Sequence, residues 1–165
     1  MFKSRLTPLL AFCFVVVTAP VAMSQGAQVA FGSIQQNSGL PVEVTADNLA
    51  VDQNTGKAVF TGNVVIVQGE MRLSAEEVIV TYREEPRGIS RIDATGNVVL
   101  ISGTDAAESQ KANYNVDDGT IVMTGSVLVA QGPSALTADK MTVQLEQGTA
   151  QMTGRVKTVL QQDQP

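Results

Sequence analysis

The sequence contains no histidine and no tryptophan, and its single cysteine is Cys13. Cys13 lies in an N-terminal segment that we expect to be removed, so the mature chain would carry no thiol. Without imidazole and thiol groups, the usual nucleophile–base pairs and the commonest transition-metal ligands are missing. There is no phosphate-binding loop and no dinucleotide-binding glycine fingerprint either. We therefore predict that the protein is not an enzyme and holds no metal or cofactor.

Aromatic residues and clusters of basic residues are also scarce. The chain has five phenylalanines and two tyrosines, and three of the phenylalanines lie within the first 14 residues. Removal of Lys3 and Arg5 would leave 9 of the 11 basic residues against 16 acidic ones, and the net charge would change from −5 to −7. A chain without a basic patch does not neutralise phosphate groups, so we expect no nucleic-acid partner.

The first 24 residues have the pattern of a secretory signal peptide. Lys3 and Arg5 form a positive start, and the apolar run from Leu6 to Val17 is short for crossing a bilayer. Ala22-Met23-Ser24 then supplies small residues before a cleavage site at Gln25. The pattern predicts a signal peptide over residues 1–24 and export to the periplasm. The alternative is an uncleaved signal that anchors the protein in the membrane.

The remaining chain divides into two polar ends and one central domain. Residues 25–40 are rich in Gln, Gly and Ser and predict a flexible leader, and residues 161–165 predict a disordered tail. Between them, over residues 41–160, no amphipathic helix of useful length is present. Apolar residues instead alternate with polar ones at every second position, which predicts a single all-β domain.

An internal repeat runs through this domain. Its four copies are AVFTGNVVI at 58–66, IDATGNVVL at 92–100, IVMTGSVLV at 121–129 and AQMTGRVKT at 150–158. The Thr-Gly glycines are Gly62, Gly96, Gly125 and Gly154, at spacings of 34, 29 and 29 residues. Because the same pair recurs four times, we interpret these glycines as turn or bulge positions and not as a phosphate-binding loop.

A second segment precedes each copy of the repeat. The four segments are TADNLAVD at 45–52, SAEEVIVTY at 74–82, ESQKANYN at 108–115 and TADKMTVQ at 137–144. A further glycine lies six residues before the Thr-Gly glycine in three units, at Gly56, Gly119 and Gly148. Each unit therefore predicts two short antiparallel strands joined by a tight turn. We interpret the acidic pairs, including Glu76-Glu77, as solvated charges.

Alternation along the predicted strands places nearly all the apolar side chains on one face. Val, Ile, Leu, Met and Ala fill this face, and large aromatic side chains are few. Composition alone favours a packed β core, and the same face also suits a tube whose slim side chains leave room for hydrocarbon. Periodicity does not distinguish a filled interior from a hollow one.

The ordered set of repeats behind an export signal resembles the LptA family, also called OstA, of periplasmic lipopolysaccharide-transport proteins. The likeness rests on PVEVTADNLAVD at 41–52, KAVFTGNVVIVQG at 57–69, SAEEVIVTY at 74–82 and the two later units. It covers roughly residues 41–160. The resemblance implies an open, twisted β jelly roll of repeated short antiparallel strands.

The resemblance also implies a function and a set of site residues. Family members bind the lipid A acyl chains of lipopolysaccharide in their interior, and they stack head to tail between an inner-membrane anchored partner and an outer-membrane translocon. Such a bridge serves outer-membrane assembly. The expected groove-lining residues are Val42, Val44, Phe60, Val64, Ile66, Val98, Leu100, Tyr114, Met123 and Met141.

Two alternatives remain at this point. One is the membrane-anchored partner of the same pathway, which has the same fold and keeps its N-terminal helix. The other is a structural β-repeat protein of the envelope with a packed core and no ligand.

Overall fold

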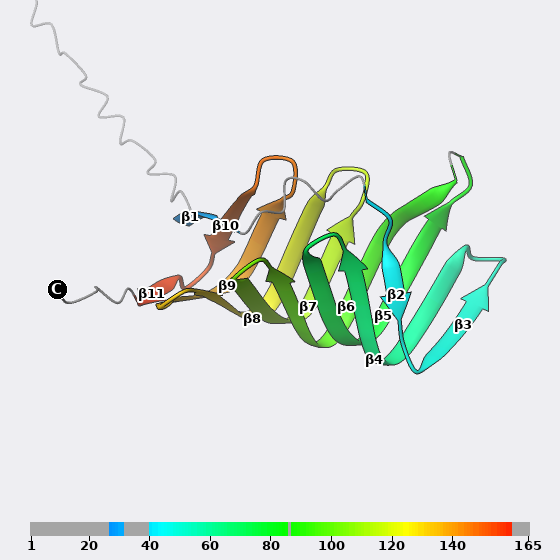
Figure 1. The fold of residues 1–165 in the computed structure, drawn as a ribbon, viewed down its shortest axis with the longest axis horizontal. Coiled ribbons are helices and arrows are strands. Elements are labelled where there is room, and N and C mark those ends of the chain that lie inside the picture. The colour runs from blue at the N-terminus through cyan, green and yellow to red at the C-terminus, as the bar shows by residue number, and fades with distance from the viewer. Residues whose placement is uncertain (1–26, 32–39, 86, 160–165) are drawn as a thin grey trace, which may run out of the picture.

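The computed structural model describes residues 27–31, 40–85 and 87–159, and the regular elements in these ranges are all β-strands. They form one antiparallel sheet in the order β1-β10-β9-β8-β7-β6-β5-β4-β2, with β11 beside β9 and β3 beside β4 (Figure 1). The strands are β1 (Ala27–Ala30), β2 (Glu43–Thr45), β3 (Asn48–Asp52), β4 (Lys57–Gln68), β5 (Met71–Arg83), β6 (Gly88–Ser102), β7 (Asp105–Asn115), β8 (Thr120–Gln131), β9 (Ser134–Gln144), β10 (Thr149–Thr153) and β11 (Lys157–Val159). The prediction of an all-β, open antiparallel sheet is confirmed.

The long strands bend near their middle, so that the one sheet folds into two layers. In β4, for example, residues 57–61 pair with β3, residues 65–67 pair with β2, and the register shifts between Thr61 and Val64. Layer A contains β2, β11 and the strand halves 64–68, 71–75, 98–102, 105–109, 127–131 and 134–138. Layer B contains β1, β3, β10 and the halves 57–61, 77–83, 88–95, 111–115, 120–124 and 140–144. We expected separate short strands, whereas β4 to β9 are continuous strands of 11 to 15 residues.

The Thr-Gly glycines form the corner where the two layers meet. Gly62, Gly96, Gly125 and Gly154 have φ angles between 78° and 86°, a range that favours glycine. Space also requires glycine there, because a Cβ atom on Gly96 would lie 2.5 Å from Glu76 Oε2 and 2.8 Å from Glu76 Cβ. The predicted bulge role of these glycines is confirmed.

Three of the four corners carry a side-chain hydrogen bond across the bend. The pairs are Asn63 Nδ2 to Asp47 Oδ2 at 2.8 Å, Asn97 Nδ2 to Glu76 Oε1 at 2.5 Å, and Arg155 Nε to Asp139 Oδ1 at 3.0 Å. Hydrogen bonding to Asp139 and its negative charge raise the pKa of the Arg155 guanidinium. Glu76 is therefore a corner partner and not simply the solvated charge that we expected, because the bend brings it against Gly96 and Asn97.

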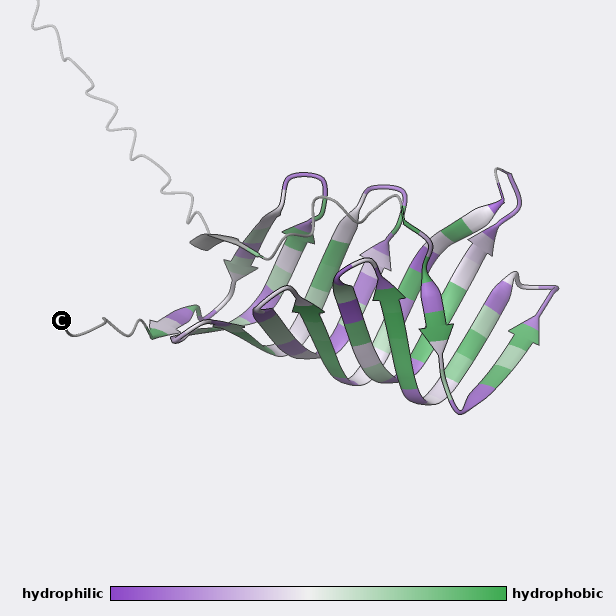
Figure 2. Ribbon diagram, viewed as in Figure 1, coloured by the Kyte–Doolittle hydropathy of each residue, from purple (hydrophilic) through white to green (hydrophobic). Residues whose placement is uncertain are grey.

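The turns away from the corner form the outer margin of each layer, which we call its lip. The three repeat-spaced glycines, Gly56, Gly119 and Gly148, lie in layer B turns with φ angles of 61°, 58° and 63°. This agrees with the predicted tight turns. Figure 2 shows that the hairpin connections are predominantly hydrophilic and that hydrophobic residues lie along the strands.

The N-terminal region departs from its predicted character. Residues 27–30, which we placed in a flexible leader, form β1 and pair antiparallel with β10 from Ala27↔Met152 to Ala30↔Thr149. The next residue, Phe31, is fully buried. The polar composition around this segment hid the strand, because pairing at a sheet edge depends mainly on backbone groups. The predicted signal peptide and C-terminal tail lie outside the described residues.

Candidate functional site

The inner faces of the two layers meet along the whole roll. Directly paired residues line up there in rows, because cross-strand partners point to the same side of a sheet. One row of layer A contains Ile66, Leu73, Leu100, Ala107, Val129 and Leu136. One row of layer B contains Ala58, Val80, Ile92, Tyr114, Ile121, Val143 and Ala150. All of these residues belong to the buried hydrophobic core.

All ten residues that we expected to line a groove face this interior. Seven of them are buried in the core, namely Val64, Ile66, Val98, Leu100, Tyr114, Met123 and Met141. The other three, Val42, Val44 and Phe60, are partly buried and pack against it. Their burial agrees with the single apolar face that alternation predicts, and their part in binding a ligand stays a prediction.

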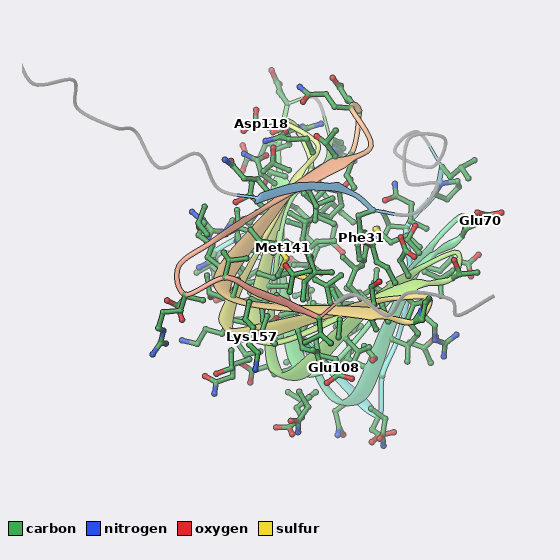
Figure 3. All side chains as sticks on the ribbon, turned by 90° about the vertical axis from the view of Figure 1, so that its left-hand side faces the viewer. Phe31, Glu70, Glu108, Asp118, Met141 and Lys157 are labelled. Atoms are coloured by element: carbon green, nitrogen blue, oxygen red, sulfur yellow. The ribbon has the colours of Figure 1, made fainter. Side chains whose placement is uncertain are left out.

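Side chains fill the interior. Leu100, Met123 and Met141 are all 0% exposed. Figure 3 looks along the roll and shows Met141 and Phe31 between the layers, while Glu108 and Lys157 point outward. A cavity of about 10 Å³ lies between the layers, which is room for roughly one water molecule. Its lining consists of Ile66, Met71 and Leu73 from layer A and Ile92, Ala94, Ala112, Tyr114 and Ile121 from layer B.

Tyr114 is the one aromatic residue of this cavity lining and brings a polar atom into the interior. Its side chain is 4% exposed, and its buried hydroxyl has no hydrogen-bond partner. Burial raises the pKa of the Tyr114 phenol, because the low-dielectric interior disfavours the phenolate. The hydroxyl is therefore protonated at neutral pH and is able to donate a hydrogen bond.

The two ends of the roll differ from its middle because sheet edges lie there. β2 and β3 end the two layers at one end of the long axis, and β11 and β1 end them at the other (Figure 1). On β3, Leu49 and Val51 are 57% and 63% exposed although they pair with the inward residues Phe60 and Ala58. Their pairing places Leu49 and Val51 on the inner face of layer B. They are nevertheless exposed, because β3 is the edge strand of that layer.

Other kinds of site have little support in the described part of the chain. Its His, Cys, Asp and Glu side chains nowhere gather in a group of three that could hold a metal ion. The same residues include no helix with the length and apolar character needed to cross a membrane.

A single antiparallel sheet, bent at a glycine corner around an apolar interior, defines an open β jelly roll. The same architecture is found in the crystal structure of LptH from Pseudomonas aeruginosa, described as the LptA homologous periplasmic component of a lipopolysaccharide transport device. The TM-score is 0.69 at 18% sequence identity, and the match covers 76% of this chain and 99% of LptH. At this identity the likeness shows the fold.

Residues 43–162 match the family described as LptA/(LptD N-terminal domain) LPS transport protein, and the chain belongs to this family. The resemblance seen in the repeats is therefore confirmed. Membership of a family of transport proteins also agrees with the prediction that the protein is not an enzyme.

Two relatives illustrate how the chain compares with longer proteins. An uncharacterized protein of Rhizobium meliloti (strain 1021) is 30% identical over 112 residues, which are 64% of this chain and 60% of the relative. The LPS-assembly protein LptD of Escherichia coli (strain K12) is 37% identical over 87 residues, 50% of this chain and 11% of LptD. The matched region is thus a small part of LptD and about three fifths of the Rhizobium protein.

Proposed function

We propose that the protein is a periplasmic lipopolysaccharide-binding transport protein that shields lipid A acyl chains between layers A and B. The observation that carries this proposal is the apolar inner surface, which runs from Val44 and Phe60 at one end to Met141 and Met152 at the other. At roughly 0.8 kcal/mol per methylene, exposing a chain of about a dozen carbons to water costs on the order of 10 kcal/mol. A carrier that moves such a chain through water needs a continuous apolar path.

Entry of acyl chains into a filled interior requires the layers to separate. Each backbone ladder runs within one layer, and the layers share their backbone only where the strands bend. Separation at the lips therefore leaves the ladders intact. When an acyl chain enters between the separated layers, the apolar side chains exchange contacts with one another for contacts with the chain. Little apolar surface is therefore left in water.

The sheet edges support a head-to-tail assembly that bridges the inner and outer membranes. Edge strands carry backbone groups that are ready to pair with another chain. If β2 and β3 of one molecule pair with β11 and β1 of the next, both layers continue and the apolar path lengthens. Such a heterologous contact uses different surfaces on the two copies and need not close into a ring. The exposed Leu49 and Val51 would be covered in this contact.

The filled interior also favours a second candidate, a structural envelope module with a packed core and no ligand. The two candidates differ in their response to a polar group on the inner face. The membrane-anchored partner of the same pathway differs in its N-terminal segment, outside the described residues, and intact-mass measurement of the exported protein distinguishes it by retention of the first 24 residues.

The test compares neighbouring residues of β6 that point to opposite faces. Val98 is fully buried inside and Val99 lies on the outer face, so Val98→Thr and Val99→Thr make the same change on opposite sides. Binding of fluorescent lipopolysaccharide to each purified, folded protein is then measured by titration. We expect weaker binding for Val98→Thr and unchanged binding for Val99→Thr. Equal affinities, or no binding by the unsubstituted protein, would refute the proposal.

A further inference from the structure

The inner face of layer A is not apolar up to its lip. Its last row before the turns, which we call the polar row, contains Gln68, Met71, Ser102, Asp105, Gln131 and Ser134, and each is the ladder partner of the next. The polar row lies on the inner face of the layer. Gln68, for example, is four positions after the buried Val64 on β4, and residues an even number of positions apart on a strand point to the same side. In the same way, Ser102 is two positions after the buried Leu100 on β6. Five of the six side chains are polar.

Burial separates one end of the polar row, formed by Gln68, Met71 and Ser102, from ordinary strand ends in water, whereas the other three residues are partly exposed. Ser102 is 0% exposed and Gln68 is 2% exposed. The Ser102 hydroxyl has no hydrogen-bond partner, although a buried polar group without one destabilises the fold. Ser109, on the neighbouring strand β7, is also a buried serine. Its hydroxyl, unlike that of Ser102, has a partner, because it donates to the Lys111 carbonyl oxygen at 2.9 Å. Ser102 therefore has hydrogen-bonding capacity that the fold does not use.

A second unused hydroxyl belongs to a residue that shares a cavity with one member of the polar row. The buried hydroxyl of Tyr114, on layer B, has no partner, and Tyr114 lines the same cavity as Met71. Met71 is also the ladder partner of Ser102. Met71 thus adjoins both residues, Ser102 along the ladder of layer A and Tyr114 across the cavity, at the border between the apolar interior and the polar row.

The remaining groups indicate which ligand chemistry fits this border. The Gln68 side-chain amide donates to the backbone carbonyl oxygen of Leu40 at 3.0 Å, so the row already binds an amide carbonyl. The Gln131 amide donates to Asp105 Oδ2 at 2.8 Å. A carboxylate repels phosphate but accepts hydrogen bonds from hydroxyl groups.

From these observations we infer that the polar row and Tyr114 form a binding site for the uncharged polar groups at the head end of acyl chains, namely amide or ester carbonyls and hydroxyls. The inference rests on the proposed function. Apolar residues deeper between the layers hold the hydrocarbon, and the Ser102 and Tyr114 hydroxyls donate to the linkage groups. The row fixes the depth at which each chain enters and favours acyl chains over plain alkyl chains.

The first test uses variants that remove only an oxygen atom. Ser102→Ala and Tyr114→Phe each delete an unpartnered hydroxyl, so we expect an unchanged or raised melting temperature. For each variant we expect lipopolysaccharide affinity to fall by about threefold to tenfold, the usual worth of one hydrogen bond. The control Ser109→Ala removes a hydroxyl that is already bonded within the chain, and we expect a lower melting temperature with unchanged affinity.

The second test examines the linkage group directly. Decanoyl-N-methylglucamide carries an amide carbonyl, whereas decyl maltoside has a chain of similar length joined through a glycosidic oxygen and carries no carbonyl. We expect Ser102→Ala to weaken competition by the glucamide against fluorescent lipopolysaccharide and to leave competition by the maltoside unchanged.

The outcomes separate this inference from the proposed function. If the unsubstituted protein binds lipopolysaccharide and both hydroxyl variants bind it equally well, the polar row is only structural and the inference is wrong. An equal effect of Ser102→Ala on both detergents also overturns it. Loss of binding in Val98→Thr alongside unchanged binding in Ser102→Ala would retain the proposed function and reject the polar site. No binding by the unsubstituted protein would reject both.

Discussion

Substitution of the corner glycine Gly96 by alanine tests the physical basis of the fold. At φ 81° the backbone at Gly96 is unfavourable for any side chain, which costs about 1–2 kcal/mol. The new methyl group would also collide with Glu76, whose Cβ and Oε2 lie 2.8 Å and 2.5 Å from its position. Glu76 must then move and lose its bond from Asn97, which costs about 1 kcal/mol more. We expect a total loss of about 2–3 kcal/mol.

Gly132→Ala is the matched control. Gly132 also has a positive φ, 53°, but nothing lies within 4 Å of a Cβ atom placed on it. Asn97 itself adopts φ 44°, which shows that a side chain is compatible with this region in the same protein. We therefore expect Gly132→Ala to cost about 1 kcal/mol, mainly from the backbone conformation.

Thermal unfolding followed by circular dichroism measures the difference. For a domain of this size, a loss of 1 kcal/mol lowers the melting temperature by about 4 °C, so Gly96→Ala should melt about 4–8 °C below Gly132→Ala. Urea unfolding gives the same comparison in free energy. Equal losses for the two variants would show that close contact at the corner is not what requires glycine there.

Three other predictions concern the interior, its titration and the sheet edge. Leu100→Ala, in the fully buried row, should cost about 2–5 kcal/mol in urea unfolding, whereas Leu128→Ala, 37% exposed, should cost well under half as much. Burial raises the Tyr114 pKa above its ordinary 10.0, so above about pH 10 the unfolded chain loses a proton that the folded chain keeps, and stability falls as the pH rises. Urea midpoints from about pH 8 to about pH 11 should show this fall flattened in Tyr114→Phe, and a slope equal to that of the unsubstituted protein would contradict the assignment. Leu49→Lys with Val51→Lys should abolish concentration-dependent association in sedimentation velocity, while Ile101→Lys on the outer face should not, and persistent association in the β3 variant would exclude that edge as the contact.

The sequence predicted the faces of the strands because burial imposes a period of two on them. Val98, Leu100 and Met123 face the interior as expected, and the glycines of the Thr-Gly pairs are bulges. The repeat itself made these predictions secure, since four copies in the same register share one local geometry. The family resemblance then supplied the overall architecture.

Features that depend on contacts distant in sequence were not predicted. Nothing local indicates that the residues on either side of Gly96 belong to one bent strand, because the bend depends on Glu76, 20 residues earlier. The recurrence of Asp47, Glu76, Gln110 and Asp139 at equivalent repeat positions was the available signal, and it points to the same corner in every unit.

The buried polar residues near the lip were missed for a related reason. Ser102 and Gln68 stand next to turns, where polar residues are usually solvated, so composition gives no sign of their burial. Their burial arises from packing between the layers. β1 escaped notice because an isolated four-residue strand in a polar segment has too few positions to show a period.

Site-specific photocrosslinking in cells tests the central claim, that lipid A acyl chains travel between the layers, most directly. Probes at Val44, Phe60 and Leu100 face the interior, and probes at Glu43 and Leu128 face outward as controls. We expect lipopolysaccharide adducts at the three inward positions and none at the controls. Folded, exported protein without adducts at any inward position would contradict the account and favour a packed structural module.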